Sequence, residues 1–67
     1  MQGKVKTWVV AKGYGFIAPD DGGDDLFVHH SQLKDGLDRL AIGARLEFDA
    51  ARQPDGRVRA VTVELVD

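Results

Sequence analysis

Cysteine is absent from this chain of 67 residues, so neither a disulfide nor a thiolate metal site can hold it together. A domain of this size buries only about 60% of the surface that its unfolded chain exposes, which makes its stability marginal. Stability must therefore come from packing alone. The length leaves no room for a separate catalytic domain or a linker, and we expect a single domain over residues 1–67.

Long apolar runs are missing as well. No stretch of the sequence approaches the roughly 20 apolar residues that span a bilayer. The N-terminus leads straight into a predicted strand instead of forming a signal sequence. These two absences predict a cytoplasmic protein with no membrane partner.

An excess of positive charge, which is typical of nucleic-acid binders, is also missing. Nine Lys and Arg against eleven Asp and Glu give a formal net charge of −2. Placement matters more than this sum, because charges are screened over about 8–10 Å at physiological salt. Basic residues cluster on the first two predicted strands, at Lys4, Lys6 and Lys12. The acids crowd at 20–21, 24–25 and 35–38, and we expect them to be remote from the lysines.

Aromatic residues make up only 7% of the chain, but several of them fall in two short motifs. Tyr14 and Phe16 alternate within Lys12-Gly13-Tyr14-Gly15-Phe16-Ile17, and Phe27 and His29 alternate within Leu26-Phe27-Val28-His29-His30. Side chains at i and i+2 of a strand share a face, and the aliphatic residues between these rings suit the interior. Outward rings can stack on unpaired bases at about 1–3 kcal/mol per base, whatever the base. The motifs therefore predict a binder of single-stranded nucleic acid.

Alternation and turn residues predict five strands, over 4–10, 13–18, 26–29, 46–50 and 58–66. Ser31 is expected to cap a helical turn over 32–34. The long loop over 35–43 is pinned by Leu40, with Ile42 as a second candidate, and Phe48 belongs to the core. Five short strands favour a closed barrel, because an open sheet would leave two edges and a bare apolar face. We expect an all-β, five-stranded antiparallel OB-fold barrel, whose second and third strands form the oligonucleotide face.

Both motifs, in this order, resemble those of a bacterial cold-shock protein, and the resemblance to the cold-shock domain family extends over nearly the whole chain. It begins at Gly3-Lys4-Val5-Lys6 and continues through Ser31, Leu40 and Gly43 to Leu46-Glu47-Phe48. RNA-recognition modules share part of the first motif, but they have an aromatic where Pro19 stands here, and their two motifs occur in the opposite order. The resemblance implies a cold-shock domain that binds single-stranded RNA or DNA with low sequence specificity. It also implies a role as an RNA chaperone or as a regulator of transcription or translation.

The resemblance further implies which residues bind. Family binding positions are matched by Lys6, Lys12, Tyr14, Phe16, Asp25, Phe27 and His29, and Arg57 lies near a basic contact of the last loop. Three stacking positions depart from the family, because Thr7 replaces the usual tryptophan, His30 replaces a phenylalanine and Leu37 stands where an aromatic is frequent. Trp8 takes the place of the phenylalanine that follows the usual tryptophan, and it faces a ligand only if a bulge turns it there. We include Trp8 and His30 among the binding candidates.

A catalytic site is not evident. Asp24-Asp25 and His29-His30 are sequence neighbours whose side chains diverge on a regular strand. No nucleophile has a base at plausible spacing, and no glycine-rich phosphate loop opens a helix. We expect a monomer without enzymatic activity, metal or cofactor. The remaining alternative is an OB-type protein-interaction module with little affinity for nucleic acid, whose acidic surface and reduced ring face serve a protein partner.

Overall fold

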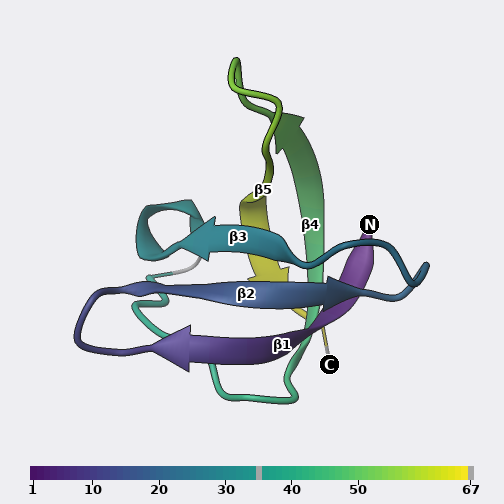
Figure 1. Ribbon diagram of the computed structural model, residues 1–67. Coiled ribbons are helices and arrows are strands. Elements are labelled where there is room, and N and C mark those ends of the chain that lie inside the picture. The colour runs from purple at the N-terminus through teal and green to yellow at the C-terminus, as the bar shows by residue number, and fades with distance from the viewer. Residues whose placement is uncertain (35, 67) are drawn as a thin grey trace.

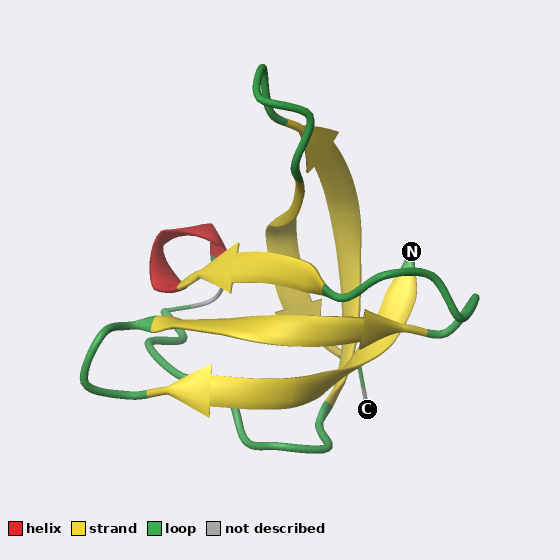
Figure 2. Cartoon of the chain, in the orientation of Figure 1, coloured by secondary structure: helices red, strands yellow, loops and turns green. Residues whose placement is uncertain are grey.

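The computed structural model describes residues 1–34 and 36–66, which form five strands and one short 3-10 helix. The strands are β1 (Gln2–Val9), β2 (Tyr14–Pro19), β3 (Leu26–His29), β4 (Arg45–Arg52) and β5 (Val58–Leu65), and the helix η1 (His30–Gln32) follows β3 directly (Figure 2). Every predicted strand is present, with ends displaced by no more than two residues. Among the described residues, no helix is long and apolar enough to cross a membrane.

The strands close into a barrel in the order β1-β2-β3-β5-β4. In Figure 1, β1, β2 and β3 lie side by side, β4 and β5 cross them, and the β4–β5 loop projects beyond the barrel. The expected five-stranded barrel is confirmed. Four pairs are antiparallel, whereas β3 and β5 meet in parallel through Phe27 and Arg59. A parallel pair is unavoidable, because an odd number of strands cannot alternate in direction all the way around a closed barrel.

Two irregularities bend the sheet. The β1–β2 register shifts between Val5 and Thr7, and the β4–β5 register shifts between Glu47 and Asp49. Opposite the second shift, Thr62 of β5 has a φ of 54°, in the left-handed region that a β-branched residue seldom adopts. Bulges of this kind bend a strand and increase its twist, which helps a small sheet to close on itself.

Aliphatic side chains and one phenylalanine fill the barrel. The buried core consists of Val5, Ile17, Leu26, Val28, Leu40, Leu46, Phe48, Ala60 and Val63. The core positions predicted for Phe48 and Leu40 are confirmed, since these residues are only 1% and 5% exposed.

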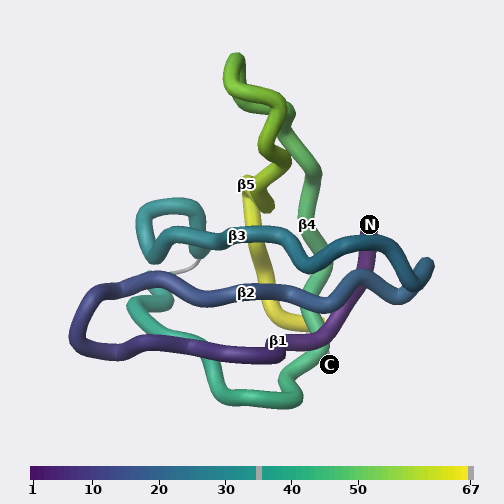
Figure 3. The backbone as a smooth tube through the Cα atoms, in the orientation of Figure 1, coloured from purple at the N-terminus to yellow at the C-terminus, as the bar shows by residue number. Residues whose placement is uncertain are grey.

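The loop before β4 follows the surface of the barrel (Figure 3). Asp35, where we expected this loop to begin, lies outside the described residues. Ile42 does not pin the loop as predicted, because it is 71% exposed. Backbone hydrogen bonds from Gly43 N to Val5 O and from Val5 N to Ala44 O tie the end of the loop to β1. Ile42 precedes these tied residues and its side chain remains in solvent.

Candidate nucleic-acid interface

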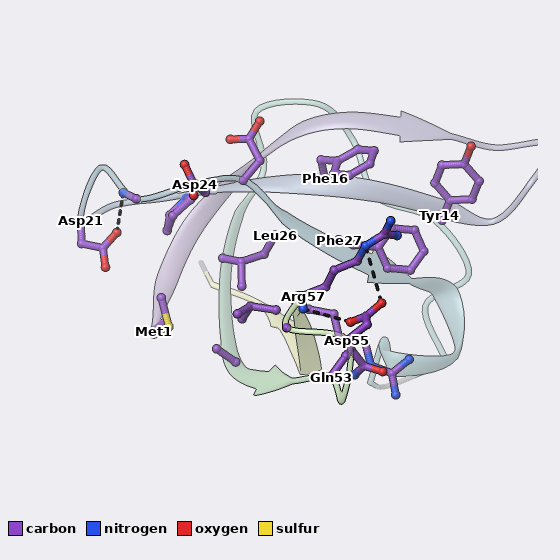
Figure 4. Close-up of a pocket in the computed structure, with 17 residues that line it drawn as sticks. Met1, Tyr14, Phe16, Asp21, Asp24, Leu26, Phe27, Gln53, Asp55 and Arg57 are labelled. Atoms are coloured by element: carbon purple, nitrogen blue, oxygen red, sulfur yellow. Dashed lines mark hydrogen bonds and ion pairs between the residues drawn. The ribbon is translucent and has the colours of Figure 1, made fainter.

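Three aromatic side chains lie together on the outer side of β2 and β3, and we call Tyr14, Phe16 and Phe27 the ring face (Figure 4). The strand register places Phe16 opposite Phe27, with ring centroids 5.9 Å apart and planes at 74°. Tyr14 lies 5.4 Å from Phe27 and 6.4 Å from Phe16. The edge contacts of Phe16 and the tilted contact between Tyr14 and Phe27 hold the rings in place, and Phe16 remains 37% exposed.

The residues between the rings explain this orientation. Ile17 and Val28 are completely buried, so their neighbours in β2 and β3 must point outward. Gly15 faces inward opposite Val28, and a side chain there would collide with the carbonyl oxygen of Thr7. The alternation seen in the sequence therefore sends the rings outward because the aliphatic positions occupy the core.

Trp8 points away from the ring face. The bulge in β1 pairs Thr7 with Phe16 and Trp8 with Gly15, so Thr7 lies beside the ring face while Trp8 packs against the core. A Cβ atom on Gly15 would lie 2.6 Å from Cε3 of Trp8, which shows how closely the indole covers this glycine. The Nε1 atom is enclosed and has no hydrogen-bond partner among the described residues. The bulge thus turns Trp8 inward, and its predicted place among the binding residues does not fit the structure.

The two histidines meet instead of diverging. His29 ends β3 opposite Tyr14, whereas His30 already belongs to η1. Their ring centroids are 4.3 Å apart with planes at 38°, so the rings are partly stacked. The divergence expected of two neighbours on a regular strand does not occur, because β3 ends between the two residues.

His29 also caps η1, a role that we predicted for Ser31. The Nδ1 atom of His29 accepts a hydrogen bond from Ser31 N at 3.2 Å, and it lies 2.9 Å from Ser31 Oγ. The imidazole of His29, and not the hydroxyl of Ser31, therefore accepts from an amide inside the turn, that of Ser31 itself. His30 N donates to Gly13 O, and a Cβ atom on Gly13 would lie 2.5 Å from Cδ2 of His30. Both histidines consequently extend the outer surface from the ring face toward the β1–β2 turn.

The predicted basic contacts have different surroundings in the structure. Lys6 is exposed, but its Nζ atom lies 2.9 Å from Oδ2 of Asp25, another predicted binding residue. An exposed pair of this kind contributes only about 0–1 kcal/mol, so a phosphate group can displace it. Lys12 is exposed in the β1–β2 turn, next to the Gly13 backbone that holds His30.

A groove continues from the ring face across β3 to the β4–β5 hairpin (Figure 4). Its hairpin side is lined by Gln53, Asp55, Gly56, Arg57, Val58 and Arg59. Arg57 lies where we expected a basic contact, with its Nε atom 3.6 Å from Oδ2 of Asp55. Its backbone N also donates to Oδ1 of that aspartate at 3.0 Å. Arg57 therefore lines the groove with the carboxylate of Asp55 next to its guanidinium.

Sequence reasoning missed Arg59, which the barrel brings next to the ring face. Arg59 is the β5 residue that pairs with Phe27, it is half-buried, and it lines the groove. Its neighbour Ala60 is completely buried, so the side chain of Arg59 is directed outward. The one signal in the sequence was the spacing of Arg57 and Arg59, which says nothing about the strand beside them.

Acidic residues also enter the groove, contrary to the expectation that they are remote. Asp21, Asp24, Asp25 and Asp55 all line it, because both the β2–β3 loop and the β4–β5 hairpin border the groove. Asp20 instead forms an ion pair with Arg45 at 2.6 Å. Within residues 1–34 and 36–66, no three His, Asp or Glu side chains gather as metal ligands would. The groove thus combines flat apolar rings with donors and acceptors of both charges.

Comparison with known families gives a match to the 'Cold-shock' DNA-binding domain over residues 1–66. Glycine-rich protein 2 of Nicotiana sylvestris is 49% identical over 63 residues, which cover 92% of this chain and 29% of that protein. The chain likewise spans only 31% and 21% of two cold-shock proteins of Arabidopsis thaliana.

Bacterial relatives match over most of their length. Cold shock-like protein CspA of Stigmatella aurantiaca is 47% identical over 55 residues, or 81% of each chain. Cold shock-like protein CspD of Escherichia coli strain K12 is 41% identical over 63 residues, which cover 92% of this chain and 85% of that protein. Among solved structures, drosophila Unr CSD456 superposes with a TM-score of 0.82 over 98% of this chain and 26% of its own, at 23% identity, which is a similarity of fold.

Proposed function

The chain belongs to the cold-shock domain family, a family known for nucleic-acid binding, and from this premise we propose that it binds single-stranded RNA or DNA by stacking bases on the ring face. The observation that carries the proposal is the group of three touching, outward rings on β2 and β3. Every base has a π-face, so such a platform accepts most sequences. His29 and His30 add two more flat groups at the end of the same surface.

The mechanism is binding without catalysis. A base that lies on Phe16 or Phe27 is held away from its pairing partner, so a hairpin that unfolds transiently is kept open. This competition needs no ATP and amounts to an RNA-chaperone activity, through which the protein regulates transcription or translation. Lys6, Lys12 and Arg57 supply phosphate contacts, and Asp25 accepts from a base edge once Lys6 turns to a phosphate.

Fluorescence anisotropy tests the proposal with a labelled oligothymidine strand and with a duplex of the same length. We expect the single strand to bind much more tightly, because the bases of a duplex cannot reach the rings. A hairpin with a fluorophore and a quencher at its ends, incubated without nucleotide, then measures strand opening. Binding of the single strand without hairpin opening would retain the binding function and reject the chaperone activity.

A protein-interaction module is the second candidate, and the aspartates that line the groove favour it, since carboxylates repel a polyanion. Its signature is an anisotropy that stays flat with both single strand and duplex up to high protein concentration. We give priority to nucleic acid, because the ring face suits flat neutral bases and the acids lie around it instead of on it.

Two further expectations belong to the same proposal. The protein works as a monomer, because one barrel carries the whole ring face and needs no second copy. It works in the cytoplasm, where transcripts are translated. Light scattering on the protein with and without oligonucleotide, together with cell fractionation, measures both.

A further inference from the structure

We propose that Arg59 gives the interface a local preference for guanine, by reading the edge of the base that stacks on Phe27. This inference rests on the proposed function and deepens it, because it adds one base-selective position to a surface that otherwise accepts any base. It follows from the contact between β3 and β5, from the lack of a partner for Arg59 in the described part of the chain, and from the charges around the groove.

Position is the first argument. Arg59 is the parallel partner of Phe27, so both side chains leave adjacent strands toward the same outer surface. On its other side Arg59 pairs with Ala51 of β4, whose small side chain takes up little of the space around the guanidinium. A base lying flat on Phe27 therefore has one edge directed at Arg59.

The state of the guanidinium is the second argument. The Nε atom of Arg59 is enclosed by the protein and has no hydrogen-bond partner in the described part of the chain. Neither an ion pair nor a hydrogen bond joins the rest of this side chain to residues 1–34 and 36–66, whereas Lys6 and Arg57 both have aspartate partners. Packing thus holds the stem, and the two terminal amino groups are left as donors for a ligand.

The charges around the groove indicate whether the amino groups of Arg59 bind a base or a phosphate. Four aspartates and two arginines line the groove, and one of these arginines lies beside Asp55. A phosphodiester next to the half-buried Arg59 would add negative charge to this surplus of carboxylates, whereas the side chain of Arg57 is 87% exposed and can meet a phosphate in solvent. A neutral base next to Arg59 adds no charge. On its Hoogsteen edge guanine presents two neighbouring acceptors, O6 and N7, which match two parallel N–H donors, whereas unpaired cytosine offers a comparable pair, O2 and N3, only on its Watson–Crick edge. With the Hoogsteen edge of the stacked base turned to Arg59, the chemistry next to Phe27 selects guanine.

Single-stranded oligothymidine of about eight nucleotides, a length suited to one OB barrel, is the probe. Its central base is replaced in turn by guanine, adenine, cytosine, hypoxanthine and 7-deazaguanine. For the wild type we expect guanine and hypoxanthine to bind about tenfold more tightly than adenine or cytosine, as a bidentate contact discriminates. We expect 7-deazaguanine to lose this advantage, because it stacks in the same way but lacks N7.

Three variants complete the test, each checked for folding by thermal denaturation. Arg59→Ala removes the donors, and Arg59→Lys keeps the charge without the planar pair of donors, so both should abolish the guanine preference. Arg52→Ala is the matched control, because Arg52 is exposed on β4 and does not line the groove, and it should keep the preference.

The possible failures are distinguishable. If Arg59→Ala weakens all oligonucleotides equally and lowers the salt dependence, Arg59 contacts phosphate and the inference is overturned. If the wild type binds every oligonucleotide equally well, the inference fails while the proposed function stands. If the wild type binds none of them, the proposed function itself fails.

Discussion

Replacing Phe16 by alanine should weaken single-strand binding while the barrel stays folded. The ring is 37% exposed, and it meets Tyr14 and Phe27 only through edge contacts. Loss of one base platform costs about 1–3 kcal/mol, or roughly 5- to 150-fold in affinity. Loss of two aromatic contacts costs about 1–3 kcal/mol of unfolding free energy. A chain of this size has a stability of about 3–10 kcal/mol, which exceeds this loss over nearly all of its range, so we expect the variant to remain folded.

Phe48→Leu is the matched control, because Phe48 is only 1% exposed and lies inside the barrel. Leucine shortens this side chain without emptying the core, and we expect a loss of about 1–2 kcal/mol in stability with affinity unchanged. Oligothymidine anisotropy measures affinity, and urea denaturation measures stability. Two results would refute the assignment of the ring face: a folded Phe16→Ala protein that binds like the wild type, or a Phe48→Leu protein that loses as much affinity as Phe16→Ala.

Other changes test the surroundings of the ring face. Asp55→Asn should tighten binding severalfold, because it removes a negative charge beside Arg57. The amide oxygen of the new asparagine can still accept from Arg57 N. Asp38→Asn makes the same charge change outside the groove and should have less effect on affinity. Thr7→Trp should tighten binding by about 1–3 kcal/mol in anisotropy titrations, since position 7 lies opposite Phe16 on the outer face; Thr7→Val is the control, and equal affinities would mean that bases do not reach β1. Gly15→Ala should destabilise the barrel by about 1–3 kcal/mol or more in thermal denaturation, because its Cβ would meet Trp8 and the Thr7 backbone. Gly22→Ala, at a φ of 81° with open space around it, meets backbone strain but no neighbouring atom and should cost less. A Gly15→Ala protein as stable as the wild type would show that Trp8 and the Thr7 backbone shift easily to make room.

Much of the barrel was predictable, because the pattern that separates inward from outward side chains is local to each strand. Alternation in Tyr14–Ile17 and Leu26–His29 placed the aliphatic side chains inside and the rings outside before any strand was paired. The same regularity led to errors where the backbone stops being regular. Trp8 changed sides through a single extra residue in β1, and His30 lies against His29 because the chain turns into η1 directly after β3 ends at His29, as predicted.

The other residues of the interface come together only when the strands close into a barrel. Arg59 lies next to Phe27 only because five strands in a closed ring must leave one parallel pair, here β3 and β5. The aspartates line the groove because both loops that carry them border it. The sequence by itself determined which faces of the strands are apolar, since that depends on a period of two residues. Only the tertiary structure decided which charges surround the rings, because residues from distant segments become neighbours when the sheet closes.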